Sequence, residues 1–227
     1  MTTEDPDALL AEAYALDGPA SNRSLYARWA ATYESGFVAG RGYVYPERVV
    51  AVFVEHALAG ADVGADDVVV DVGCGTGLAG VALRRRSPVA IDGIDLSPEM
   101  LQQASTKQHD GVGVYRRLLE VDLTTTLPIE TGAYAGAVSV GTFTHGHVGP
   151  ASLAEVIRIV RPGGRLAIGI NAAHFAVAGF GPAFDELMAS GRITGLRSVD
   201  VPIYDGADTI DRSDPDRYAH VAVFEVC

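Results

Sequence analysis

The glycine-rich segment at residues 71–77, DVGCGTG, constrains the fold more than any other part of this sequence. It follows a β-branched run at residues 68–70, which is typical of a strand buried on both faces of a parallel sheet. An apolar segment of helical character comes directly after it. Glycines in such a turn let the backbone bend tightly and approach a ligand, and the first turn of the helix offers free N–H groups. The segment therefore predicts a nucleotide-like ligand.

Strands and helices alternate along the rest of the chain, which is typical of a doubly wound α/β fold with a mostly parallel sheet. We expect strands at residues 68–70, 90–94, 112–121, 135–140 and 165–170, and helices at 78–86, 97–108 and 150–161. A short helix at 184–189 and two antiparallel strands at 196–203 and 218–226 follow, and residues 8–58 are helical in pieces.

Three aspartates, Asp71, Asp95 and Asp122, each end a predicted strand, where open α/β sheets bind ligands. Asp71 precedes the first glycine of the turn and can reach the amino acid part of S-adenosylmethionine, whereas it would repel a pyrophosphate. Asp95 can accept from both ribose hydroxyls, and Asp122 from the adenine amino group. Helix capping or turn formation explains an isolated aspartate equally well. Recurrence at three successive strand ends favours a ligand site.

Residues 75–80, GTGLAG, also fit the dinucleotide fingerprint GxGxxG. Spacing alone therefore leaves a nicotinamide or flavin enzyme open. Asp71 disfavours that alternative, and the sequence offers no evident set of residues for hydride transfer.

Four segments, DVGCGTG, DGIDLSPEML, YAGAVSVGTFTHGH and RPGGRL, together resemble class I S-adenosylmethionine-dependent methyltransferases. The resemblance covers about residues 25–226, and LYARWAATYESG is similar to the lid segment of that family. The stretch GTFTHGHVGP and the opening that contains Trp29 are most similar to the methyltransferase-like proteins of the Williams-Beuren region. Ala135 stands where the family usually has an acidic residue, which weakens this subfamily match.

The resemblance implies a Rossmann-like sheet of seven strands, the last of them antiparallel, with an N-terminal helical lid. Residues 1–58 would form the lid segment and residues 59–227 the methyltransferase domain, as one structural unit. The implied cofactor is S-adenosylmethionine. Its predicted binding residues are Trp29, Tyr33, Asp71, Gly73, Cys74, Gly75, Gly77, Asp95, Leu96, Met100, Asp122, Leu123, Val140 and Gly141.

Two histidines, His145 and His147, follow the fourth strand and are the candidate catalytic residues. Either can take a proton from a hydroxyl or an acidic carbon, because histidine titrates near neutrality. We prefer His145, which lies nearer the strand end; alternatively both orient substrate or satisfy loop backbone groups. The candidate substrate residues are Thr142, Phe143, His174 and Phe175. The spacing of the histidines is a poor metal signature, so no metal is expected.

The composition of the chain limits the kinds of methyl acceptor and the cellular location that we expect. With 17 basic against 29 acidic residues and Lys107 as the only lysine, the chain is a poor nucleic-acid binder. No apolar run is long enough to span a membrane, residues 1–7 lack a secretory pattern, and two cysteines make no disulfide framework, so we expect a cytoplasmic protein.

The loop at residues 141–144 lacks the Asn or Asp followed by two prolines that many amino-group methyltransferases carry. The sequence therefore predicts O- or C-methylation of a small, uncharged or aromatic acceptor by a monomer or homodimer. An S-adenosylmethionine-binding domain with another reaction, or with none, is the alternative within the same fold.

Overall fold

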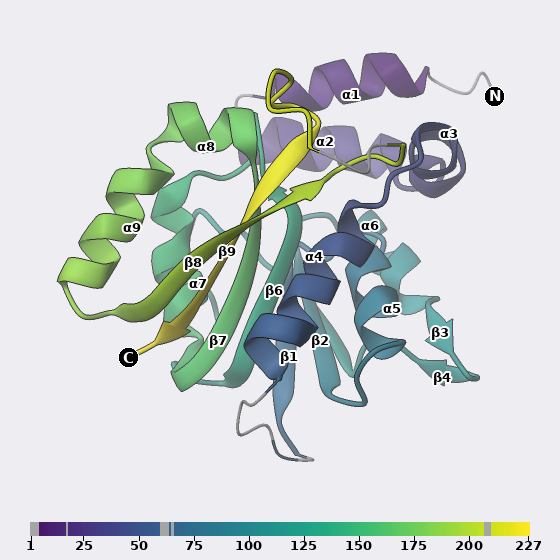
Figure 1. Cartoon of the computed structure of the whole chain (residues 1–227). Coiled ribbons are helices and arrows are strands. Elements are labelled where there is room, and N and C mark those ends of the chain that lie inside the picture. Colours follow the sequence, from purple (N-terminus) through teal and green to yellow (C-terminus); the bar gives the residue numbers. More distant parts are fainter. Residues whose placement is uncertain (1–4, 17, 60–63, 65, 207–209) are drawn as a thin grey trace.

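A seven-stranded sheet in the order β5-β2-β1-β6-β7-β9-β8 forms the centre of the structure (Figure 1). The computed structural model describes residues 5–16, 18–59, 64, 66–206 and 210–227. Strands β5, β2, β1, β6 and β7 are parallel, and β9 is antiparallel to both of its neighbours. This confirms the predicted doubly wound, mostly parallel fold. The strands are β1 (Val68–Val72), β2 (Ala90–Asp95), β5 (Arg117–Glu120), β6 (Tyr134–Phe143), β7 (Val160–Asn171), β8 (Ile193–Pro202) and β9 (Tyr218–Val226).

Helices cover both faces of this sheet, and α1 and α2 lie across one end of it (Figure 1). Residues 1–4 of the predicted lid segment lie outside the described residues. The N-terminal elements are α1 (Pro6–Tyr14), α2 (Pro19–Trp29), η1 (Tyr33–Val38), α3 (Ala39–Arg41), α4 (Tyr45–Phe53) and η2 (Val54–Leu58). The later ones are α5 (Leu78–Arg84), α6 (Pro98–Ser105), η3 (Pro150–Ser152), α7 (Leu153–Arg158), α8 (Ala172–Ala178) and α9 (Phe180–Ala189).

The buried side chains of β1 explain why this strand lies inside the sheet, between β2 and β6. Val69 packs in the apolar cluster that includes Phe53 of α4, whereas Val70 and Val72 pack in the cluster that includes Phe180 of α9. Each buried valine stabilises the fold by about 1.5–3 kcal/mol. The apolar run read from the sequence thus reflects burial on both faces. Within the described residues, no helix is long and apolar enough to cross a membrane.

The predicted strand at 112–121 is wrong as a single element. Its first part, β4 (Val112–Gly113), pairs with β3 (Gln108–His109) in a separate hairpin, and only β5 joins the main sheet. Asp110 and Gly111 both have positive φ, 51° and 77°, as the tight turn of a two-residue hairpin requires. The Asp-Gly pair therefore turns the chain before the sheet strand begins.

Residues 171–181 are more regular than the sequence indicates. The Asn171 side chain accepts a hydrogen bond from the backbone N–H of His174 at 3.0 Å and so caps α8. Gly179, at φ 81°, separates α8 from α9. The predicted helix at 184–189 consequently begins earlier, at Phe180.

Candidate functional site

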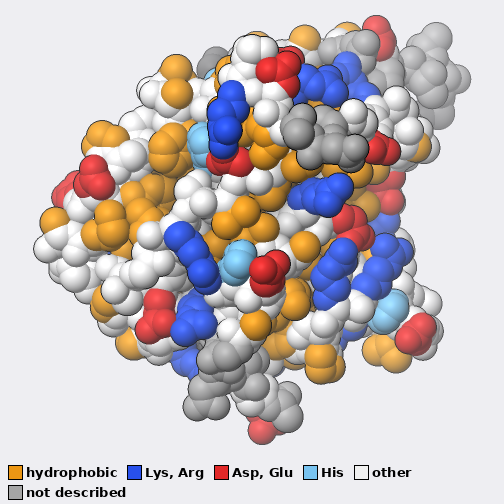
Figure 2. Space-filling view, viewed as in Figure 1, with side chains coloured by type: hydrophobic (Ala, Val, Ile, Leu, Met, Phe, Trp, Pro, Cys, Tyr) orange, Lys and Arg blue, Asp and Glu red, His pale blue; other side chains and the backbone are white. Residues whose placement is uncertain are grey.

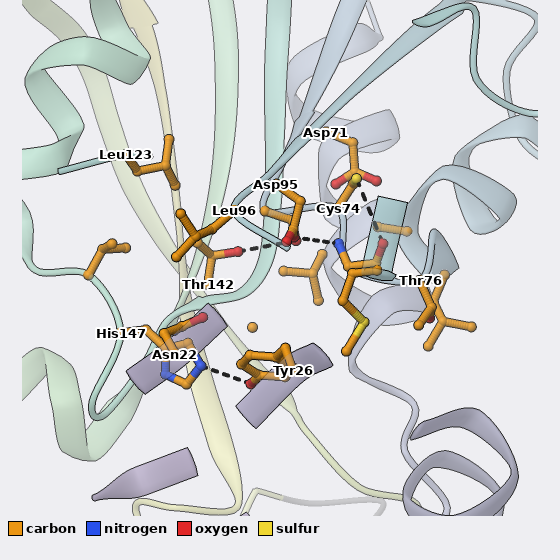
Figure 3. Close-up of a pocket in the computed structure, with 18 of the residues that line it drawn as sticks. Asn22, Tyr26, Asp71, Cys74, Thr76, Asp95, Leu96, Leu123, Thr142 and His147 are labelled. Atoms are coloured by element: carbon orange, nitrogen blue, oxygen red, sulfur yellow. Dashed lines mark hydrogen bonds between the residues drawn. The ribbon is translucent and has the colours of Figure 1, made fainter. Parts of the chain in front are cut away.

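A cavity opens at the carboxyl ends of β1, β2 and β6 and encloses about 990 Å³ of space, including its open mouth. Side chains from α2 complete it on the side opposite the sheet (Figure 3). The structure brings most of the predicted site residues to this cavity. They are Tyr33, Asp71, Gly73, Cys74, Gly75, Asp95, Leu96, Met100, Asp122, Leu123, Val140, Gly141, Thr142 and His147.

The glycine turn is shaped by close contacts that exclude larger residues. Gly73 and Gly75 have φ of 68° and 53°, and a Cβ on Gly73 would collide with Thr142 of β6. The Thr142 hydroxyl donates to the carbonyl of Val72 at 3.1 Å. The N–H groups of Gly73 and Cys74 both donate to the carbonyl of Ile94, which ties the turn to β2. The turn therefore presents bare backbone to the cavity in a fixed position.

Asp71 lies near the end of β1 and is fully buried. Its Oδ2 accepts a hydrogen bond from the Tyr115 hydroxyl at 2.7 Å, while Oδ1 has no hydrogen-bond partner among the residues that the structure describes. Burial raises the pKa of this carboxyl to about 7, and the bond from Tyr115 opposes the shift. A cationic ligand group beside Oδ1 would supply the missing partner and favour the ionised form.

Asp95 ends β2 and is held by backbone N–H groups. Its Oδ2 accepts from Gly75 at 2.8 Å and its Oδ1 from Ser97 at 2.9 Å. Burial raises the pKa of Asp95, and these backbone bonds oppose the shift. Each carboxylate oxygen keeps a free lone pair, so the fixed side chain can still accept from two ligand hydroxyls.

Asp122 also lines the cavity. Its Oδ1 accepts from the backbone N–H and the hydroxyl of Thr124 at 2.8 and 2.6 Å. Leu96, Met100 and Leu123 line the same cavity with apolar side chains. Apolar side chains and a carboxylate suit a planar heterocycle that carries a hydrogen-bond donor.

His147 connects the loop after β6 to helix α2 (Figure 3). Its Nδ1 lies 2.7 Å from the carbonyl oxygen of His145 and must carry the hydrogen, because a carbonyl only accepts. Its Nε2 therefore accepts from the Tyr26 hydroxyl at 2.8 Å. Burial lowers the pKa of His147 and keeps the ring neutral.

His145 is the preferred candidate for the catalytic base from its place in the sequence, but it does not line the cavity. Its Nε2 lies 3.5 Å from Asp216 Oδ1, and its ring packs against Tyr14 and His174. His174 Nε2 lies 3.1 Å from the carbonyl oxygen of Val148, also outside the cavity. The structure thus places only the second histidine of the pair beside the ligand space.

The remaining predicted site residues do not line this cavity. Phe143 is fully buried against Phe180, and Phe175 stacks on the same Phe180 ring. Trp29 is buried against the ring of Tyr26 and lines a neighbouring cavity. Gly77, at φ 95°, is the N-cap of α5.

The sequence reading missed several residues that complete the site. Asn22 and Tyr26 line the cavity from α2, and Thr76 lines it from the glycine turn. The hydroxyl of Thr76 is buried without a hydrogen-bond partner in the described chain. Tyr115 carries no motif at all, and only the fold brings it to Asp71.

Comparisons with known proteins agree with this geometry. Residues 69–164 match the model of the methyltransferase domain family. A 153-residue stretch, 67% of this chain, is 32% identical to methyltransferase-like protein 27 of Homo sapiens and covers 58% of that protein. A 100-residue stretch, 44% of this chain, is 29% identical to the O-methyltransferase resE of Aspergillus sclerotiorum and covers 38% of it.

Among solved structures, the chain resembles magnesium protoporphyrin IX methyltransferase from Synechocystis PCC 6803 with bound SAM. The TM-score is 0.66 at 18% identity, over 93% of this chain and 98% of that one. This likeness confirms the Rossmann-like class I fold. The chain spans less than two thirds of the curated relatives it matches. The matched domain contains the glycine turn, Asp95 and Asp122.

Proposed function

From the methyltransferase domain at residues 69–164, we propose that this chain is an S-adenosylmethionine-dependent methyltransferase for a small-molecule acceptor, acting by O- or C-methylation. One observation carries the proposal. Asp71, buried beside a bare-backbone turn, keeps an oxygen without a partner in the described chain. The ammonium group of S-adenosylmethionine supplies the cation that this oxygen lacks.

The remaining residues fit the other parts of the cofactor. Asp95 can accept from the ribose hydroxyls, the apolar side chains of Leu96, Met100 and Leu123 suit the adenine ring, and Asp122 can accept from the adenine amino group. The bulge in β6 brings Gly141 to the cavity, beside the expected position of the sulfonium. When bound, S-adenosylmethionine supplies a methyl group for in-line displacement, and its leaving thioether needs no proton.

His147 is the residue we propose as general base where the acceptor must lose a proton. It is neutral, it lines the cavity, and its Nε2 already accepts a hydrogen from the Tyr26 hydroxyl. A positioned base of this kind contributes about 10²- to 10⁴-fold to a rate. An acceptor hydroxyl can replace Tyr26 at Nε2 or donate to the Tyr26 oxygen.

A small-molecule acceptor is supported by charge and by the fungal relative, which is an O-methyltransferase. The net charge is −12, and basic and acidic side chains are interspersed on the face seen in Figure 2. The nicotinamide alternative loses support, because Gly77, the second glycine of its fingerprint, does not line the cavity. In a dinucleotide site that glycine lets the backbone approach the pyrophosphate.

We extend the proposal to the subfamily of the Williams-Beuren region, supported by 32% identity to a methyltransferase-like protein and by the segment at 141–150. The cytoplasmic location, the division at residue 58, the lack of a resident metal and a monomeric or homodimeric state remain predictions from the sequence.

Calorimetry with S-adenosylmethionine, S-adenosylhomocysteine and NADH tests the cofactor. We expect the first two to bind and NADH not to bind; tight binding of NADH alone would overturn the proposal. Transfer of labelled methyl from S-adenosylmethionine to a panel of phenols and carbon acids then tests the reaction. Cofactor binding without transfer to any acceptor would favour a domain that performs another reaction.

A further inference from the structure

A second cavity adjoins the first at the point where the methyl group is expected. Both cavities are lined by Tyr26, Tyr33, Tyr43, Gly141 and His147. Gly141 has φ 74°, and a Cβ there would lie 3.2 Å from the Tyr43 hydroxyl, so the glycine keeps the junction open. The second cavity therefore extends from the expected sulfonium into the space beneath the lid.

Aromatic side chains make up most of the wall of this second cavity, and none of its described lining residues is Asp, Glu, Lys or Arg. Burial raises the pKa of Tyr33, Tyr43 and Tyr45 and lowers that of His147, so all of these groups are neutral at pH 7. A charged molecule entering here would lose its water without gaining a counter-charge. The wall favours an uncharged, planar ligand.

Two polar atoms in the wall have no hydrogen-bond partner among the residues that the structure describes. They are the Nδ2 of Asn171 and the hydroxyl of Tyr45, in side chains that are 3% and 2% exposed. A buried polar group left unpaired costs about 1–3 kcal/mol. A ligand that accepts a hydrogen bond would remove this penalty.

Other polar groups of the same wall have partners. The Tyr26 hydroxyl donates to Nε2 of His147, and Nδ1 of His147 is bonded to the carbonyl oxygen of His145. Asn171 also has its carbonyl oxygen engaged, by the N–H of His174. The amide nitrogen of Asn171 is left without a partner in the described chain, and its N–H donors require an oxygen or nitrogen acceptor on the ligand.

We propose that the second cavity binds the methyl acceptor as an uncharged aromatic molecule with an acceptor oxygen, which the Asn171 amide and the Tyr45 hydroxyl recognise. This inference rests on the proposed methyltransferase function and assigns its specificity. In this proposal the aromatic ring stacks among the tyrosines, and its oxygen accepts hydrogen bonds from these two residues.

The probe for this cavity is 4-hydroxyacetophenone, titrated by calorimetry into protein saturated with S-adenosylhomocysteine. We expect it to bind at least tenfold more tightly than 4-hydroxybenzoate or tyramine, because these are charged. It should also bind more tightly than 4-ethylphenol, which lacks the carbonyl oxygen. Equal or tighter binding of tyramine would overturn the inference in favour of a cation site formed by the aromatic rings.

Two substitutions test the recognising residues. Tyr45→Phe should weaken probe binding about twofold to tenfold, the range of one hydrogen bond, without lowering the melting temperature, since that hydroxyl has no partner to lose. Asn171→Asp keeps the oxygen that caps α8 and removes the amide donor, so it should weaken the probe similarly. Tyr218→Phe, which removes a hydroxyl outside both cavities, is the matched control.

The titration of S-adenosylhomocysteine itself separates the two proposals. If it fails to bind the unaltered protein, the proposed function is wrong and this inference falls with it. If S-adenosylhomocysteine binds normally but the probe does not bind the unaltered protein, only the inference is overturned. The same holds if the probe binds the unaltered protein, Tyr45→Phe and Asn171→Asp equally.

Discussion

The ring of Tyr115 fills the space beside Gly80, and its hydroxyl donates to Asp71 at 2.7 Å. A Cβ on Gly80 would overlap that hydroxyl. The last glycine of the dinucleotide fingerprint therefore has a packing role here, against a tyrosine. It makes room for the tyrosine that holds the buried carboxylate, so Asp71 and Gly80 both depend on a residue distant in sequence.

Asp71→Asn should raise the stability of the ligand-free protein at pH 8 while removing cofactor binding. The folded-state pKa of Asp71, about 7, lies above its unfolded value of about 4, so its stabilising contribution is full below pH 4 and lost as pH rises through 7. Asparagine carries no charge, so the variant should gain about 1–3 kcal/mol at pH 8 and little at pH 4. Urea unfolding at both pH values measures this; equal differences would contradict the assigned pKa.

Cofactor affinity should rise with pH between 6 and 8. S-adenosylmethionine is cationic and favours ionised Asp71, whose protonation in the free protein competes with binding. Tyr115→Phe removes a hydrogen bond to the ionised form, so the rise should move to higher pH and affinity at pH 7 should fall. Calorimetry across pH tests this, and a flat profile for the unaltered protein would refute it.

Gly80→Ala should weaken cofactor binding, although Gly80 does not line the cavity. The new methyl group displaces Tyr115 and so removes a hydrogen bond from Asp71, which we expect to reduce affinity about threefold to tenfold. Gly181→Ala in α9 is the control, because a Cβ there meets nothing within 4 Å. The control should bind normally and gain about 0.5–1 kcal/mol of stability. Similar binding by both variants would show that Tyr115 is not required.

Local signals in the sequence sufficed for the sheet and for the residues at its edge. The valine run before Asp71 marks burial on both faces, and the Ser-Pro pair before α6 gives the expected cap, with the Ser97 hydroxyl accepting from Met100 at 3.2 Å. These features depend on neighbours along the chain, so they can be predicted from the sequence without knowledge of the fold.

The roles of residues that depend on contacts distant in sequence could not be predicted from the sequence. Phe143 and Phe175 were predicted at the substrate, but the aromatic cluster around Phe180 takes both into the core. His145 and His147 are two residues apart, and contacts with distant segments distinguish them: His147 bonds to Tyr26 of α2, whereas His145 lies beside Asp216. Such distinctions require knowledge of which segments meet in space.

Asp95→Ala should weaken the binding of S-adenosylmethionine by about 2 kcal/mol or more, because it removes a charged acceptor and also leaves the N–H of Gly75 without its acceptor. Asp122→Ala should cost less, since Asp122 is proposed to accept one hydrogen bond, from the adenine amino group, whereas Asp95 is proposed to accept from two ribose hydroxyls. Calorimetry on both variants shows which substitution causes the larger loss of cofactor affinity. An unchanged affinity in Asp95→Ala would mean that the ribose site lies elsewhere.

Asp92 holds the outer half of the sheet through a charge cluster away from the cavity. Its fully buried carboxylate accepts from Arg116 at 2.8 and 2.9 Å, from Arg117 at 2.9 Å and from the Tyr134 hydroxyl at 3.2 Å. Burial raises the pKa of Asp92, but the two arginines outweigh burial and hold it below its usual range. The contribution of Asp92 to stability is therefore present above pH 4 and lost as pH falls through its folded pKa.

Asp92→Ala should destabilise the protein by about 1–3 kcal/mol at pH 7, because the buried Tyr134 hydroxyl loses its acceptor while the half-exposed arginines return to water. Asp92→Asn keeps an acceptor for Tyr134 and should lose less. Urea unfolding from pH 7 to pH 3 should show the gap between Asp92→Ala and the unaltered protein narrowing below pH 4. A gap that stays constant to pH 3 would mean that packing, and not the ionised carboxylate, makes this residue stabilising.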